Sequence, residues 1–109
     1  MEKTQSILRV IERLREIDAE MQIQSAAVLL RVAANEVPIK MKDIAADLGI
    51  SQASVSRNIG YLGGVNRHHE KGHNLVEAYE DPNERRRKLC KLTPKGKRFI
   101  KGMEDLICQ

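Results

Sequence analysis

The side chains best suited to chemistry lie on one side of a short predicted helix that Ser51 can cap. They are short, polar or flexible, so this side of the helix can lie against a surface that offers hydrogen-bond donors and acceptors. The edges of DNA base pairs in the major groove form such a surface. The outward positions are Ser51, Gln52, Ala53, Ser56 and Arg57.

These residues belong to a predicted pair of short helices, residues 41–62, joined by a tight turn at Gly49. The spacing is that of a helix-turn-helix, whose first helix crosses the sugar–phosphate backbone while the second enters the major groove. Two-helix corners with a glycine turn also occur in all-α domains that bind no nucleic acid, so the pattern needs support from the rest of the chain. The apolar positions are Ile44, Ala45 and Leu48 on the first helix, and Ile50, Val55, Ile59 and Leu62 on the second.

Charge is distributed unevenly along the 109 residues, a length typical of one domain. The net charge is +4, yet residues 84–101 hold nine basic residues and one acid, so this segment carries +8 and the rest of the chain −4. The segment predicts a basic patch suited to phosphate, whereas a solvated surface helix usually intersperses both signs. The basic residues are Arg85, Arg86, Arg87, Lys88, Lys91, Lys95, Lys97, Arg98 and Lys101.

Aromatic residues are scarce, with no Trp, one Phe and two Tyr. Proteins that bind single strands or RNA loops stack bases on aromatic rings, so this composition fits double-stranded DNA better. No nucleophile is paired with a positioned base and no phosphate-binding glycine motif occurs, so we expect a protein that is not an enzyme and needs no cofactor.

Cysteine and histidine give little sign of a metal centre. Cys90 and Cys108 lack metal-type spacing, and we expect no disulfide between them. His68, His69 and His73 fall in a polar stretch after the second helix, but no Cys or carboxylate lies at a characteristic spacing, so a histidine-bearing loop is expected and metal binding is the alternative. With no signal peptide and no long apolar run, the expected location is the cytoplasm, away from membranes.

The remaining helices and strands are predicted from the spacing of apolar residues and from residues that end a helix or form a turn. Apolar spacing predicts an amphipathic helix over residues 4–20 and a core helix over residues 24–34, ended by Pro38, with a very short strand near Ile39. Residues 75–79 and 87–92 read as strands of a hairpin that turns at residues 81–84, and Thr93 can cap a last helix, residues 94–108. The predicted fold is mainly α with a small β-hairpin, a single winged helix-turn-helix domain whose wing spans residues 74–93.

The wording of the hairpin resembles the wing of the MarR family (multiple antibiotic resistance regulators). Glu84-Arg85-Arg86 is followed, after five residues, by Leu92-Thr93-Pro94-Lys95-Gly96, which is similar to the acidic residue, spacer and arginine that precede Leu-Thr-x-x-Gly in that family. Asp81-Pro82-Asn83 resembles the family's wing turn, and residues 51–57 its recognition helix. The resemblance covers residues 41–97.

This resemblance implies a sequence-specific, double-stranded DNA-binding transcriptional regulator, and a repressor because nothing resembles an activation segment. It implies that Arg86, flanked by Arg85 and Arg87, enters the minor groove, where a narrow groove attracts arginine, and that Glu84 orients it. Gln52, Ser56 and Arg57 would face the major groove, with Arg57 reaching either a guanine edge or only a phosphate.

A homodimer on a pseudopalindromic site is expected, because one winged helix contacts only a few base pairs. Family members usually have longer terminal helices that enclose a ligand pocket, so a small-molecule effector is conceivable here but unsupported, and no cysteine sits where a thiolate would be stabilised for redox sensing. The stripes predicted to form the dimer are Ile7, Val10, Ile11, Leu14 and Ile17 on the first helix and Phe99, Met103, Leu106 and Ile107 on the last.

Two other functions fit the same fold. A plasmid or phage replication or partition protein would bind repeated origin sites instead of a promoter palindrome. A winged helix that only binds proteins would show no salt-dependent affinity for DNA, because that dependence comes from phosphate contacts.

Overall fold

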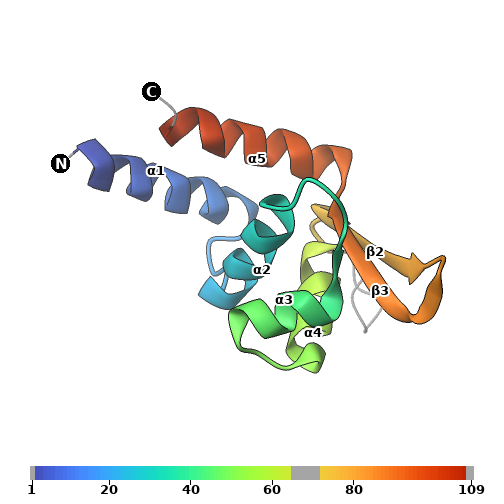
Figure 1. Cartoon of the computed structure of the whole chain (residues 1–109). Coiled ribbons are helices and arrows are strands. Elements are labelled where there is room, and N and C mark those ends of the chain that lie inside the picture. Colours follow the sequence, from blue (N-terminus) through green and yellow to red (C-terminus); the bar gives the residue numbers. More distant parts are fainter. Residues whose placement is uncertain (1, 65–71, 108–109) are drawn as a thin grey trace.

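The computed structural model describes residues 2–64 and 72–107 and contains five helices and three strands in those ranges (Figure 1). The predicted class, mainly α with a small β-hairpin, is confirmed. In chain order the elements are α1 Glu2–Ile17, α2 Ile23–Ala33, β1 Ile39–Lys40, α3 Met41–Leu48, α4 Gln52–Leu62, β2 Val76–Asp81, β3 Glu84–Leu92 and α5 Pro94–Ile107.

The helix-turn-helix has the local structure that its residues predict. Gly49 ends α3 in the left-handed region at φ +67°, a conformation that glycine adopts without steric cost. The Ser51 side chain caps α4 by accepting a hydrogen bond from the Ser54 backbone N–H at 3.0 Å. The turn and the cap therefore set where α4, the predicted recognition helix, begins.

The sheet has the order β1-β3-β2, and both pairings are antiparallel. The short strand expected near Ile39 is present, with Ile39 paired to Cys90. The hairpin turns more tightly than expected, because Asp81 pairs directly with Glu84 and its carboxylate accepts a hydrogen bond from the Asn83 N–H at 2.9 Å. β3 consequently begins at Glu84 instead of residue 87.

Helix α2 forms the centre of the core, as its nearly apolar sequence predicts. Val28 and Leu29 are fully buried, and α2 packs against α3, α4 and β3. Leu75, Val76 and Cys90 close the core from the base of the hairpin. The helix-turn-helix and the wing are thus held on one common apolar body.

The junction between the wing and α5 is closely packed. The Thr93 hydroxyl donates to the Asn74 carbonyl at 2.7 Å and accepts from the Gly96 N–H at 2.9 Å, so Thr93 caps α5 as predicted. A Cβ built on Gly96 would lie 2.0 Å from the Leu75 carbonyl oxygen. Only glycine fits at this contact between the first turn of α5 and the start of the wing.

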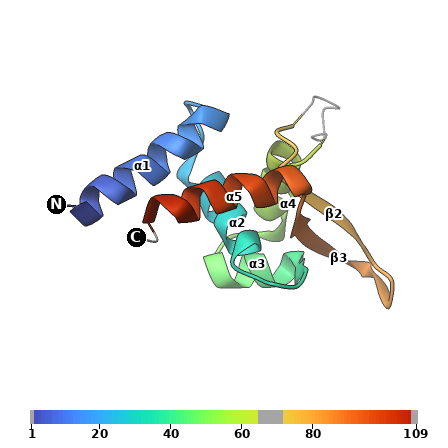
Figure 2. The ribbon, with the colours of Figure 1, turned by 90° about the horizontal axis from the view of Figure 1, so that it is seen from above.

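The terminal helices α1 and α5 lie side by side, as both ribbon views show (Figures 1 and 2). This packing corrects part of the predicted dimer surface, because Leu14, Phe99 and Met103 are buried within the chain itself. The Arg13 guanidinium also lies over the Phe99 ring, 5.0 Å from its centroid. Of the remaining predicted positions, Ile7, Ile11 and Ile107 are exposed, and Val10, Ile17 and Leu106 are half-buried.

Helix α1 ends at Ile17, three residues before the predicted end. Asp18 begins a turn there, since its carboxylate accepts a hydrogen bond from the Glu20 N–H at 2.9 Å. Within the described ranges, none of the helices has the length and apolar character needed to cross a membrane.

Candidate nucleic-acid interface

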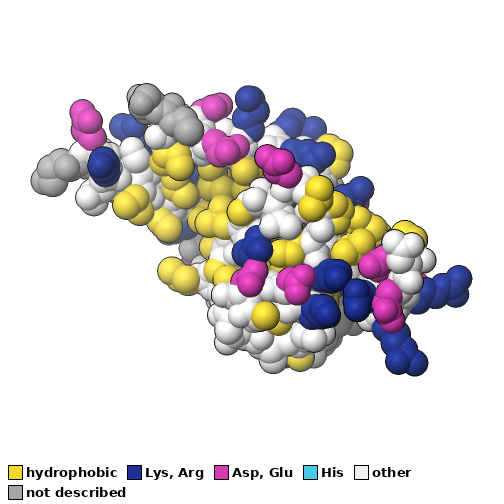
Figure 3. Space-filling view, in the orientation of Figure 1, with side chains coloured by type: hydrophobic (Ala, Val, Ile, Leu, Met, Phe, Trp, Pro, Cys, Tyr) yellow, Lys and Arg dark blue, Asp and Glu magenta, His cyan; other side chains and the backbone are white. Residues whose placement is uncertain are grey.

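A groove of about 470 Å³ lies between the starts of α3 and α4 and the outgoing strand of the wing. Among the residues that the structure describes, five basic residues and no acidic residue line it, and Figure 3 shows Lys and Arg side chains gathered where α3 meets the hairpin. The local potential is therefore positive, as binding of phosphate requires. The lining residues are Lys40, Met41, Lys42, Gln52, Ala53, Ser56, Arg86, Arg87 and Lys88.

The predicted recognition residues do not all reach this groove. All five outward positions of α4 and its cap are exposed, and Gln52, Ala53 and Ser56 line the groove. Ser51 is used as the cap. Arg57 lines a different, polar pocket beside α2, and its Nη2 donates to Ser54 Oγ at 3.0 Å. The first turn of α4 thus faces the groove while Arg57 lies at its flank.

The wing places its arginines differently from the expectation. Glu80 pairs with Lys88 and Asp81 with Glu84, so Arg85, Arg86 and Arg87 form a bulge without partners on β2. Arg86 and Arg87 line the groove and Arg85 is exposed outside it.

This bulge bears on the expected orientation of Arg86 by Glu84, because it interrupts the alternation of a regular strand. Among the described residues, the ion pair that Glu84 makes is with Arg87, at 3.8 Å between Oε2 and Nη2. In this structure the carboxylate of Glu84 therefore lies nearest to Arg87, and its predicted role in orienting Arg86 stays a prediction.

Sequence reasoning missed Lys40 and Lys42, which flank the start of α3 and line the groove. The available signal was a pair of lysines on either side of the first residue of a predicted helix-turn-helix. Conversely, the predicted single basic patch is divided, because only Arg86, Arg87 and Lys88 of its nine members line the groove.

The other basic residues of that segment lie elsewhere. Lys91 pairs with Glu77 at 3.3 Å and lies over the Tyr79 ring, 5.4 Å from its centroid. The Lys95 ammonium donates to the His73 carbonyl at 3.0 Å. Lys97, Arg98 and Lys101 are exposed along α5.

A polar pocket of about 400 Å³ separates α4 from the corner between α1 and α2. There the Tyr61 hydroxyl donates to the Asp18 carboxylate at 2.5 Å. This hydrogen bond holds the pKa of Asp18 below its ordinary value. Burial, and then the same hydrogen bond, raise the pKa of Tyr61. At neutral pH Tyr61 therefore keeps its proton and Asp18 is ionised, as a hydrogen bond from the hydroxyl to the carboxylate requires.

The structure offers no sign of metal or thiolate chemistry in the residues that it describes. Burial raises the pKa of Cys90 to about 11, so its thiol stays protonated and unreactive at neutral pH. No group of three potential metal ligands occurs within residues 2–64 and 72–107. The expectations for His68, His69 and Cys108 fall outside these residues, whereas the His73 ring packs edge-on against Tyr61 at 4.8 Å between centroids.

Comparison with known proteins gives similarity in structure only. No protein-family model matches the chain, and no curated protein matches it by sequence. The PcaV transcriptional regulator from Streptomyces coelicolor, solved with its natural ligand, aligns over 81% of this chain and 56% of its own, with 23% identity and a TM-score of 0.61.

Two further solved structures agree. MarR aligns over 87% of this chain and 57% of its own, with 21% identity and a TM-score of 0.66. The S. aureus MepR–DNA complex aligns over 96% of this chain and 75% of MepR, with 21% identity and a TM-score of 0.71. The chain thus spans a little over half the length of PcaV and MarR. At these identities the likeness shows the fold: the chain has a MarR-type winged helix.

Proposed function

We propose that this protein is a transcriptional regulator that binds double-stranded DNA at specific sequences. The observation that carries the proposal is the groove between the recognition helix and the wing, which five cations and no carboxylate line within residues 2–64 and 72–107. Such a surface suits the phosphate backbone. The fold adds support, because MepR, which is similar in structure, was solved bound to DNA.

The residues that line the groove would contact different parts of the duplex. Gln52, Ala53 and Ser56 lie in the first two turns of α4, and the N-terminal part of a recognition helix contacts base edges in the major groove. Lys40 and Lys42 would hold the backbone beside it. Arg86, free of the ion pair that Glu84 makes with Arg87, would enter the adjacent minor groove.

We further propose a homodimer that represses by occupying a pseudopalindromic promoter site. Ile7 is 62% exposed, Ile11 40% and Ile107 54%, and they lie on the two adjacent terminal helices. A second copy could cover these apolar side chains and place two recognition helices on one face of the duplex. Repression then needs only occupancy of the promoter.

Sedimentation equilibrium tests the dimer. We expect the mass of two chains at concentrations on the order of 10 µM, and the double variant Ile7→Glu/Ile11→Glu should sediment as one chain because it would bury charge in the interface. Exchange of the exposed Ile23 for Glu on α2 is the matched control. A single-chain mass for the unmodified protein would contradict the dimer.

Selection of bound duplexes from a random pool tests the function. An inverted repeat with half-sites about one helical turn apart is the expected product for a dimeric regulator. Enrichment of tandem repeats would support the replication or partition alternative instead. An unenriched pool would contradict sequence-specific binding.

Two single substitutions should separate base contacts from backbone contacts on the selected duplex. Gln52→Ala should cost about 1–3 kcal/mol and relax the preference at one base position, because Gln52 lines the groove. Arg57→Ala should weaken all duplexes alike and lower the salt slope, because Arg57 lies at the flank of the groove. Competition assays with single-base variants of the duplex measure both effects, and a reversed pattern would contradict this assignment.

A further inference from the structure

Asn58 is a polar side chain on the otherwise apolar inner face of the recognition helix α4. It is 8% exposed, beside the buried Val55, Ile59 and Leu62. Its Oδ1 accepts a hydrogen bond from the buried Ser25 hydroxyl at 2.6 Å. Its Nδ2 donates to Gln24 Oε1 and to the Ser54 carbonyl, both at 2.9 Å. The amide therefore joins the middle of α4 to the first turn of α2.

Tyr61 makes a second hydrogen-bonded link on the same side of α4, and the hydrogen bonds of Asn58 and of Tyr61 are called the two polar ties of α4. It follows Asn58 by three residues, so the two side chains are neighbours on the helix surface and line the same pocket. Its hydroxyl reaches the Asp18 carboxylate at 2.5 Å. Together the two ties join α4 to residues 18–25, the corner between α1 and α2.

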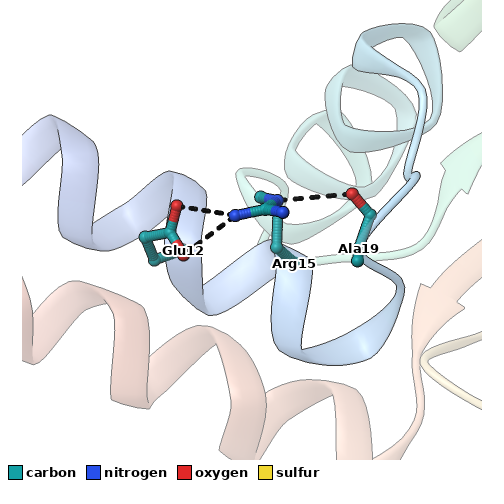
Figure 4. Close-up of polar contacts among 3 residues, drawn as sticks. All are labelled: Glu12, Arg15 and Ala19. Atoms are coloured by element: carbon teal, nitrogen blue, oxygen red, sulfur yellow. Dashed lines mark hydrogen bonds and ion pairs between the residues drawn. The ribbon is translucent and has the colours of Figure 1, made fainter.

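The corner is itself braced (Figure 4). Arg15 Nη1 donates to both carboxylate oxygens of Glu12, at 3.0 and 3.1 Å, and Arg15 Nε donates to the Ala19 carbonyl at 3.3 Å. The Glu20 N–H bonds to Asp18 Oδ1 at 2.9 Å. These hydrogen bonds hold the turn that presents the Asp18 carboxylate to the Tyr61 hydroxyl.

Apolar packing favours burial of the inner face of α4 but depends little on direction, whereas hydrogen bonds require particular distances and angles. A helix held only by Val55, Ile59 and Leu62 could rotate or slide slightly at small cost. Discrimination between base pairs depends on side-chain placement within a fraction of an ångström, unlike the attraction to phosphate. A polar tie can therefore serve specificity more than affinity.

We infer that Asn58 and Tyr61 are positioning residues, which lock the rotation and depth of the recognition helix against the corner of residues 18–25 and thereby determine its choice of DNA sequence. They touch no base themselves. This inference rests on the proposed function, because it concerns how the same helix is presented to the duplex.

The test compares dissociation constants for the selected duplex and for a random-sequence duplex of the same length. Asn58→Leu keeps the size of the side chain and removes the amide, and Tyr61→Phe keeps the ring and removes the hydroxyl. Each variant is expected to lower the specificity ratio about tenfold or more while the affinity for random duplex and its salt slope stay unchanged. Val32→Ala, a core substitution on α2 outside the ties, is the control for lost stability and should keep the ratio.

Two further readouts separate positioning from a merely structural role. If Ser25 acts through Asn58, the double variant Ser25→Ala/Asn58→Leu should lose no more specificity than Asn58→Leu alone. In the protein without DNA, residual dipolar couplings should show a changed orientation of α4 relative to α2 in Asn58→Leu and not in Val32→Ala. These couplings test the inference independently of any DNA binding.

The outcomes are distinguishable. If the unmodified protein shows no difference between the two duplexes, the proposed function fails, and an unchanged α4 orientation in Asn58→Leu then also overturns the positioning role. If the unmodified protein discriminates and Asn58→Leu and Tyr61→Phe keep the full ratio, only the positioning role is overturned. An equal loss of the specificity ratio in Val32→Ala would assign the effect to lost stability, and this too would overturn the positioning role.

Discussion

Replacing Arg86, Arg87 and Lys88 together by alanine is expected to weaken duplex binding on the order of 100-fold at about 0.15 M salt. These three side chains contribute three of the five cations that line the groove in the described part of the chain. Each cation that neutralises a phosphate adds about 0.9 to the slope of log K against log salt, so the triple variant should lose about 2.7 from that slope. Fluorescence anisotropy titrations with labelled duplex at several salt concentrations measure both quantities.

The matched control has the same loss of charge at another place. Lys97→Ala/Arg98→Ala/Lys101→Ala also removes three positive charges, all from exposed positions on α5 that do not line the groove. We expect its affinity to fall only slightly, through the weaker long-range field. Equal losses in the two triple variants would show that net charge, and not the groove, binds DNA.

Gly96→Ala is expected to cause a large loss of stability for the addition of a single methyl group. The added Cβ would lie 2.0 Å from the Leu75 carbonyl oxygen, a backbone atom at the base of the wing. Relief requires α5 or the start of β2 to shift, which would also strain the Thr93 cap. Overpacking of this kind costs about 1–3 kcal/mol and sometimes more. Urea denaturation followed by circular dichroism measures the change in the free energy of unfolding.

Gly102→Ala, on the same helix, is the matched control. Its Cβ would lie 3.0 Å from Arg13 Nη2, the end of a flexible side chain that can move aside. Alanine is favoured over glycine inside a helix by about 1 kcal/mol, so this variant should be as stable as the parent or more stable. Equal destabilisation by the two substitutions would refute the account of Gly96 as a position restricted by the Leu75 carbonyl.

This contact gives a physical reason for the pattern Leu-Thr-x-x-Gly at the end of the wing. Thr93 caps α5 and bonds back to Asn74, and Gly96 lets the capped helix approach Leu75. Both residues thus serve one junction, which sets where the wing leaves the core. The pattern was recognisable in the sequence, whereas the contact that explains it required the structure.

Local signals predicted most of the elements. Gly49, Ser51 and Thr93 act through backbone groups a few residues away, so their roles could be inferred without knowledge of the fold. Amphipathic periodicity identifies a buried face but not what covers it. For this reason the apolar stripes predict that Leu14 and Phe99 face a second copy, although α1 and α5 of the same chain pack together and both residues are buried.

The groove could be predicted only in part, because it joins segments distant in the sequence. The arginines of the wing were found from a local run of charge, but Lys40 and Lys42 reach them only when β1 pairs with β3. The bulge after Glu84, which gives Arg87 the carboxylate expected for Arg86, depends on a register shift that no local pattern reveals. A run of charged residues in the sequence therefore indicates a function, whereas the pairing of distant strands determines which of the charged residues lie in one site.

The central claim, that the groove binds double-stranded DNA, is tested most directly by the salt dependence of duplex affinity in the unmodified protein. If the five groove cations and Arg57 each displace one counterion, log K should fall linearly with log salt with a slope of about −5 to −6 for each chain. Absence of measurable affinity at low salt, or affinity that does not change with salt, would contradict the claim.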